Sequence, residues 1–484
     1  MWADLSPSRG AQGQLNSNSG DIVGVRDDLQ TLVCELDRIH GNGFHDAKAV
    51  ITESGLPDFV TAENGVQRHF TGKARQALAH VAATLHGDDS SISSFIELGN
   101  FENILRQTVA DLHAAGDFEG FCANGNVDAK AKLLKEIHSR ISRLTNEFTH
   151  SFGAWTLGME WKHPFRLGPV TFFSREQWID SVDFHDEAKE HYLEEKEANF
   201  RWREILKEAL SRPKDATPLP GLASAVYSAL AECPSVLKVT IKGHEKELSR
   251  KLAELVCKTA LDAVSLLFGG PEFFHQQALH DERLPPVGSD RLTESNGFLW
   301  LPGMSLGMRI RHLSYDQVTT ALTNMSRSLE KFEPILDALV NPASHSHPKL
   351  AQRWATALDW FGEGNREKSD AIALAKIGTS LDVLCCGGKF KGIRDTVVHL
   401  TGVPGDEEVI RGRQSKTLSA LVKNIYDDGR SQILHGTHYE RLKSFAQERD
   451  RAAYIARIVL IEAAVRLRKY TGDDTDKAFR TMPK

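Results

Sequence analysis

The chain of 484 residues has few cysteines and no long hydrophobic run. Its six cysteines are scattered and show neither the Cys-x-x-Cys spacing of zinc sites nor the density of a secreted disulfide framework, so we expect reduced thiols in the core. The most apolar segment, 455–465, is too short to span a bilayer and contains Arg457 and Glu462. The N-terminus has no basic region followed by an apolar stretch. These absences predict a cytoplasmic protein without a membrane partner.

Common motifs for nucleotide phosphates and metals are also missing. The sequence contains no Walker loop and no His-Glu-x-x-His, and the glycines at 41 and 43 lack the third glycine of a Rossmann pattern. His345 and His347 lie in a proline-bounded loop without a nearby cysteine or acidic ligand, so we interpret them as solvated. We therefore expect neither a cofactor nor a metal ion.

Charge is distributed unevenly along the chain. The net charge is -6, but residues 341–484 hold 24 basic and 18 acidic side chains, and residues 1–340 hold 35 basic and 47 acidic ones. A basic C-terminal part on an acidic remainder favours a phosphate-handling module carried by a regulatory or sensing body. The alternative is that surface charge is scattered at random. Net charge affects how a protein associates with partners, but it does not determine the fold.

Hydrophobic periodicity predicts a mainly α fold with a small β component. Helical spacing dominates the N-terminal region, and alternation of apolar and polar residues marks short strands in the middle of the chain. The predicted helices are 73–86, 100–115 and 129–149, and the predicted strands are 170–173, 237–241 and 306–310. A helix follows Gly243, and capping boxes at Ser174 and Ser314 start two more.

Six segments follow from these patterns. Prolines and small polar residues mark the clearest linker, and beyond it the apolar residues follow the spacing of four main helices, so the N-terminal α+β body precedes a four-helix bundle. The segments are a flexible arm (1–22), a helical region (23–155), a mixed α+β domain (156–340), the linker (341–349), the bundle (350–471) and a tail (472–484). The four bundle helices are 350–361, 371–385, 418–425 and 443–470.

A candidate catalytic segment lies between the third and fourth of these helices. It reads Tyr-Asp-Asp-Gly-Arg-Ser-Gln-Ile-Leu-His-Gly over residues 426–436. This passage resembles the Tyr-x-x-x-Arg-Ser-x-x-x-His-Gly signature of the ApeA-like branch of the HEPN superfamily, and residues 354–386 look like the first two helices of that domain. The resemblance covers about 350–471. It implies metal-independent RNA cleavage in a homodimer, often as a bacterial toxin or antiviral effector.

The chemistry of two residues fits this implication. Cleaving RNA without a metal needs an acid, a base and a cation beside the phosphate. His435 can act as acid or base because an imidazole titrates near neutral pH, and the planar, permanently charged guanidinium of Arg430 matches two phosphate oxygens. On an ideal helix the two side chains point about 140° apart. Either the helix breaks near Gly429 and Gly436, or a two-fold partner supplies the second set; we favour the dimer.

Three neighbouring residues are predicted to support this pair. Asp382 continues the apolar stripe of its helix, where an unpaired carboxylate is costly, so we expect it to pair with Arg430 or to orient His435; the alternative is an edge position in solvent. Tyr426, one turn before the arginine, either stacks on a base or packs. Ser431 is expected to form a cap or a hydrogen bond near the motif.

The sequence therefore predicts a HEPN endoribonuclease that acts in antiphage defence, abortive infection or as a toxin. The expected partners are the RNA substrate, a second copy bound through the bundle, and a phage-derived or nucleotide trigger at the N-terminal body. The alternative is a non-catalytic HEPN adaptor that binds a nucleotide or a protein, in which Arg430 and His435 only stabilise a helix end. His438 is interpreted as solvated.

Overall fold

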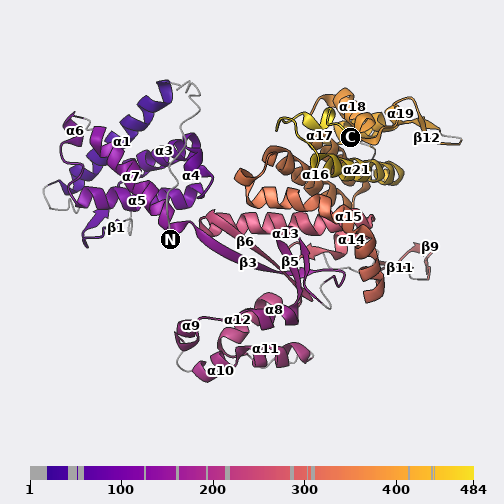
Figure 1. Ribbon diagram of the computed structural model, residues 1–484, viewed down its shortest axis with the longest axis horizontal. Coiled ribbons are helices and arrows are strands. Elements are labelled where there is room, and N and C mark those ends of the chain that lie inside the picture. The colour runs from indigo at the N-terminus through magenta and orange to yellow at the C-terminus, as the bar shows by residue number, and fades with distance from the viewer. Residues whose placement is uncertain are drawn as a thin grey trace. The chain divides into compact units, whose positions relative to one another are not determined.

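The computed structural model describes residues 19–41, 52, 59–124, 127–159, 163–191, 195–212, 219–283, 288–301, 303–306, 311–412, 415–437, 440 and 442–484. These residues are mainly helical with a small β component, as the periodicity predicts (Figure 1). The chain divides into two compact units, Met1–Glu147 with Lys242–Ser249, and Phe148–Ile241 with Arg250–Lys484. The predicted arm, 1–22, lies mostly outside the described residues.

The first unit is a group of helices around its own apolar core. Its elements are α1 (Ser19–His40), β1 (Phe59–Thr61), β2 (Gln67–His69), α3 (Gly72–Asp88), α4 (Ser90–Ser93), α5 (Leu98–Ala114), α6 (Phe121–Asn124) and α7 (Val127–Leu144). Thr71 caps α3, because its hydroxyl accepts the Ala74 N–H at 3.1 Å. Leu32, Phe70 and Phe101 are fully buried in the core.

A disulfide bond in this unit corrects the expectation that all cysteines are reduced. Cys34 on α1 is joined to Cys122 on α6, with a Cα–Cα distance of 5.6 Å. The two residues are 88 positions apart, so only the folded helices bring them together. The spacing of the cysteines in the sequence therefore could not predict that these two form a disulfide. The thiols of Cys233, Cys257, Cys385 and Cys386 are free.

A five-stranded sheet follows the first group of helices. Its order is β4 (Phe165–Leu167), β5 (Val170–Ser174), β6 (Ser235–His244), β3 (Asn146–Trp155) and β7 (Ala278–Leu279). The predicted strands at 170–173 and 237–241 are confirmed, and they pair antiparallel with Phe172 opposite Leu237. The helix predicted to run to 149 ends at Leu144 instead, because the aromatic residues Phe148 and Phe152 continue with the two-residue period of β3.

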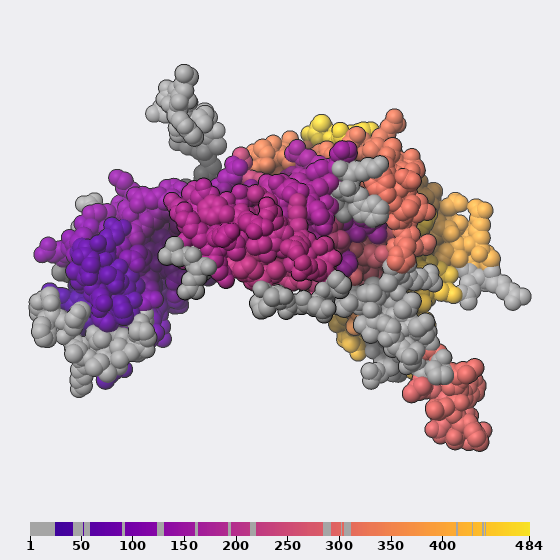
Figure 2. All heavy atoms as spheres, turned by 90° about the horizontal axis from the view of Figure 1, so that it is seen from below, coloured from indigo at the N-terminus to yellow at the C-terminus, as the bar shows by residue number. Residues whose placement is uncertain are grey.

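A short ribbon and a small helical group complete the middle of the chain. β8 (Gly288–Arg291) pairs with β11 (Gly303–Leu306), and β9 (Glu294–Ser295) with β10 (Phe298–Leu299). Of the strand predicted at 306–310, residues 307–310 lie outside the described residues. The helical group holds a core around Trp202, and its residues face the viewer in magenta in Figure 2. Its helices are α8 (Arg175–Ser181), α9 (Asp186–His191), α10 (Lys196–Phe200), α11 (Trp202–Ser211) and α12 (Gly221–Leu230).

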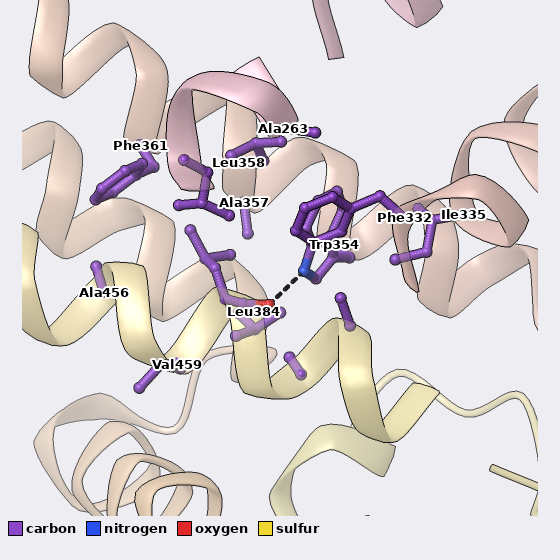
Figure 3. Packing of buried hydrophobic residues seen from close by; sticks show 14 of the residues in the cluster. Ala263, Phe332, Ile335, Trp354, Ala357, Leu358, Phe361, Leu384, Ala456 and Val459 are labelled. Carbon is purple, nitrogen blue, oxygen red and sulfur yellow. Dashed lines mark hydrogen bonds between the residues drawn. The ribbon is translucent and has the colours of Figure 1, made fainter. Parts of the chain in front are cut away.

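The C-terminal bundle shares one continuous core with the sheet and its helices. α13 (Lys246–Phe268), α14 (Pro271–Gln276) and α15 (Tyr315–Val340) precede it, and both predicted capping boxes, at Ser174 and Ser314, are present. Trp354 stacks on Phe332 of α15 and donates a hydrogen bond of 2.8 Å to the Leu460 carbonyl (Figure 3). The predicted linker contains the short helix η2 (Pro342–Ser344), which has no buried residue and connects α15 to α16 outside this core.

The bundle has more helices than the four predicted. Its elements are α16 (Pro348–Arg366), α17 (Asp370–Leu384), α18 (Lys389–Thr401), β12 (Glu408–Ile410), β13 (Lys416–Thr417), α19 (Leu418–Lys423), η3 (Asn424–Ser431), α20 (Gln432–Leu434) and α21 (Ala446–Leu467). The additional helix α18 buries Ile393, Val397 and Leu400 on one face. The segment predicted as a tail also packs, since Phe479 and Met482 are buried and η4 spans Ala478–Arg480.

No single helix within the described residues is long and apolar enough to cross a membrane. One pair, α17 and α18, passes the same test only in combination and is bent by 75°. Most of α17 is buried in the bundle core.

Candidate functional site

The predicted catalytic segment adopts a π-helix, which is rare in proteins and frequent at functional sites. Thr417 starts α19 as its cap, because its hydroxyl accepts the Ala420 N–H at 3.2 Å. The helix widens to the π form over Asn424–Ser431 and returns to an α-helical turn in α20. Gly436 ends it with a φ of 68°. Hence the chain neither continues as an ideal helix nor breaks at Gly429.

Two glycines allow the π-helix to lie close against α17. A Cβ on Gly429 would come within 2.7 Å of Leu374 Cδ2, and a Cβ on Gly378 would come within 3.0 Å of Arg430 Cβ. A side chain at position 429 would therefore require Leu374 to shift, and one at position 378 would require Arg430 to move by a few tenths of an ångström. Gly378 is therefore the residue that lets Arg430 lie across α17.

Arg430 is held in place by an ion pair and an aromatic ring. Its Nη2 lies 2.9 Å from Asp382 Oδ2, which confirms the expected pairing of Asp382 with this arginine. The guanidinium carbon lies 5.5 Å from the centre of the Tyr426 ring, a distance typical of cation–π contacts. The side chains of Arg430 and Asp382 are 21% and 18% exposed, so the pair remains accessible at the surface.

Gly378 is the site residue that the sequence prediction missed. It stands four positions before Asp382, so both residues lie on the same face of α17. In the sequence, the signal for the close approach of Arg430 is a glycine four positions before the carboxylate of Asp382.

His435 lies at the exposed end of the segment. Its backbone N–H donates to the Ser431 carbonyl at 3.0 Å, and its side chain is exposed. Among the described residues, no hydrogen bond or ion pair joins His435 to Arg430 or Asp382. Within one chain the imidazole and the guanidinium are therefore not joined by a direct contact.

Of the remaining predicted residues, Tyr426 is half-buried and packs against the bundle core. The prediction that Ser431 forms a cap or a hydrogen bond is wrong for its side chain, because Ser431 stands at the start of α20 and its Oγ makes no hydrogen bond within the described part of the chain. His438 lies outside the described residues. Lys416 donates to the Asn424 side chain at 2.7 Å, which adds a positive charge at the start of the π-helix.

The structure contains no cluster of metal-binding side chains in its described residues. His347 instead contacts the Gly472 carbonyl through Nε2 at 2.8 Å and packs against the Tyr470 ring. This contact gives the histidine a role in joining the linker to the end of the bundle.

No family model, no curated protein and no solved structure matches the chain.

Proposed function

We propose that this protein is a metal-independent endoribonuclease of the HEPN type, in which Arg430 binds the phosphate and His435 transfers protons. The observation that carries the proposal is the anchored arginine: Asp382 and Tyr426 hold the Arg430 guanidinium at the surface, five residues before an exposed histidine on the same segment. A fixed guanidinium stabilises charge that develops on a phosphate without reorganisation during the reaction.

The reaction follows from the chemistry of RNA. The 2'-hydroxyl loses its proton to a base and attacks the adjacent phosphorus, and the bond from phosphorus to the 5'-oxygen breaks as that oxygen takes a proton from an acid. The products carry a 2',3'-cyclic phosphate and a 5'-hydroxyl. A single imidazole cannot be base and acid in the same step, so a second copy of the chain supplies the other His435 across a two-fold axis.

The setting of this activity is part of the same proposal. We place the enzyme in the cytoplasm, where a disulfide such as Cys34–Cys122 is exceptional, as an antiphage, abortive-infection or toxin-type effector, active as a homodimer through the bundle. Residues 1–340, which carry a net negative charge, receive a phage-derived or nucleotide trigger. In the resting state they shield the basic bundle.

Product analysis in a chelator tests the proposed reaction. Purified protein is incubated with a labelled single-stranded RNA in excess EDTA, and the new ends are identified. The proposal predicts fragments with cyclic phosphate ends at an unchanged rate. Loss of cleavage in EDTA, or fragments with 3'-hydroxyl ends, would contradict it, and absence of any cleavage at all would favour the non-catalytic adaptor.

A further inference from the structure

A second candidate site surrounds the disulfide bond of the first unit, which joins α1 to α6 (Figure 1). Cys34 and Cys122 are both half-buried, and Cys122 packs at the edge of the apolar core. Asp37 follows Cys34 on α1, and its side chain is 44% exposed. Solvent therefore reaches the carboxylate that lies beside the bond.

A chain of hydrogen bonds determines which oxygen of Asp37 is available. Arg68 Nε donates to His113 Nδ1 at 2.8 Å, so the proton of the neutral imidazole is on Nε2. His113 Nε2 lies 3.1 Å from Asp37 Oδ1 and donates to it. Burial and the neighbouring Arg68 guanidinium lower the pKa of His113, which favours this neutral form. Asp37 Oδ1 is therefore occupied, and Oδ2 is left for another donor.

Asp37 Oδ2 faces the sulfur atom of Cys122 at a distance of 3.2 Å. A sulfur atom in a disulfide carries no hydrogen, so it cannot donate to the carboxylate. After reduction, the Cys122 thiol has a hydrogen, and the same distance suits an S–H···O hydrogen bond to a charged acceptor. The site thus offers the reduced form a stabilising contact that the oxidised form cannot make.

The two cysteines are kept near each other by contacts other than the bond. α1 is anchored in the core by its own apolar face, where Leu32 and Leu36 are fully buried. α6 is anchored by the buried Phe121, and Gln30 of α1 donates to the Cys122 carbonyl at 3.1 Å. None of these contacts involves a sulfur atom. They remain possible in the reduced protein and hold the thiols in position for the bond to form again.

We propose that Cys34 and Cys122 form a reversible thiol–disulfide exchange site for small thiols of the glutathione class, with Asp37 as the residue that positions the Cys122 thiol. The reduced small thiol opens the bond, and its disulfide restores it. The site lies entirely within the first unit, so this inference does not depend on the proposed ribonuclease activity.

The exchange takes place in two steps. A thiolate attacks one Sγ atom and forms a mixed disulfide with it, while the Sγ–Sγ bond breaks and the departing sulfur takes a proton from water. A second thiolate then attacks the sulfur of the first small thiol, so that the disulfide of the small thiol leaves and the remaining cysteine is protonated. In total, two electrons and two protons enter the protein, and two small thiols are oxidised.

Titration with glutathione tests the proposal. The full chain is equilibrated without denaturant at a constant concentration of reduced glutathione and increasing oxidised glutathione, starting from oxidised and from reduced protein. Free thiols are blocked with N-ethylmaleimide, and mass spectrometry measures the blocked fraction of Cys34 and of Cys122. We expect both cysteines to be half-blocked at the same point from either direction. A bond that stays closed in excess reduced glutathione, as structural disulfides do, or thiols that stay reduced in excess oxidised glutathione, would overturn the proposal.

Variants test the role of Asp37. Asp37→Asn keeps the size of the side chain and removes its charge, so the Cys122 thiol loses its charged acceptor. The concentration of oxidised glutathione at the midpoint should therefore fall by a factor of at least about three. Asp28→Asn is the matched control, because Asp28 lies on the same helix but faces His80, and it should titrate like the wild type. An unchanged midpoint in Asp37→Asn, or an equal shift in both variants, would overturn the assignment of Asp37.

Discussion

Arg430 Nη2 lies 2.9 Å from Asp382 Oδ2, and this contact joins the π-helix to α17. The two residues are 48 positions apart, and their side chains meet where Gly378 leaves space for the arginine stem. The ion pair fixes the direction of the guanidinium. In the proposed reaction Asp382 is thus a positioning residue.

Asp382→Asn should lower RNA cleavage by a factor of about 10 or more, because the guanidinium loses the charge that orients it. The cost in folding should be small, about 1 kcal/mol or less, as for other partly exposed ion pairs. Initial cleavage rates and thermal unfolding measure the two effects. The control is Asp395→Asn, since Asp395 pairs with Arg394 on the exposed part of α18. Equal cleavage by both variants would show that Asp382 has no positioning role.

Gly429→Ala should lower the free energy of unfolding by about 1–3 kcal/mol, because the new methyl group collides with Leu374. Denaturant unfolding followed by circular dichroism measures the change. Gly99→Ala is the matched control: Gly99 lies in α5 with open space around its Cβ position, so alanine there should be neutral or stabilise by up to about 1 kcal/mol. A neutral Gly429→Ala would contradict the close packing of the π-helix on α17.

Arg366→Met should cost about 3–5 kcal/mol at pH 7, because it leaves the buried Asp262 carboxylate without its partner. The pKa of Asp262, already raised by burial, rises further in the variant. A raised folded-state pKa means that stability is lost as pH rises through that value, so the deficit of the variant should shrink between pH 7 and pH 5.

The free energy of unfolding of the wild type and of Arg366→Met, measured at pH 7 and at pH 5, tests whether the difference shrinks on acidification. Lys376→Met, at the half-exposed edge of the same network, should cost about 1 kcal/mol or less. A deficit of Arg366→Met that stays constant or grows on acidification would refute the assignment of Asp262.

Reduction of the Cys34–Cys122 disulfide should destabilise the first unit by about 2–5 kcal/mol, because the bond closes a loop between residues 88 positions apart. Melting curves with and without dithiothreitol measure the effect. Cys34→Ser should melt at the lower temperature in both conditions, whereas Cys257→Ser should keep the sensitivity to dithiothreitol. A melting temperature that does not respond to the reductant would contradict the bond.

The sequence predicted those parts of the fold that depend on local signals. Capping boxes at Ser174 and Ser314 and the alternating residues of β6 act within a few positions, and the structure contains all three. The disulfide, the burial of Phe479 and the extra helix α18 depend on contacts between distant segments. Hydrophobic periodicity describes only neighbours along the sequence. It therefore does not indicate whether a polar segment such as the C-terminal one packs against a distant part of the chain.

The candidate site divides in the same way. The spacing of Arg430 and His435 predicts that one ideal helix does not bring both to one phosphate, but the segment forms a π-helix, so this angle stays a prediction. A carboxylate on an apolar stripe predicted a partner for Asp382. The close approach of Gly429 to Leu374 could not be predicted, because it is a contact between segments that are distant in the sequence.

The most direct test of the account is RNA cleavage by His435→Ala, compared with wild type and with His312→Ala, which removes an exposed histidine elsewhere in the second unit. The account predicts that His435→Ala loses cleavage by a factor of at least about 100 while it folds and associates like the wild type, and that His312→Ala cleaves normally. Cleavage by His435→Ala at the wild-type rate would contradict the account.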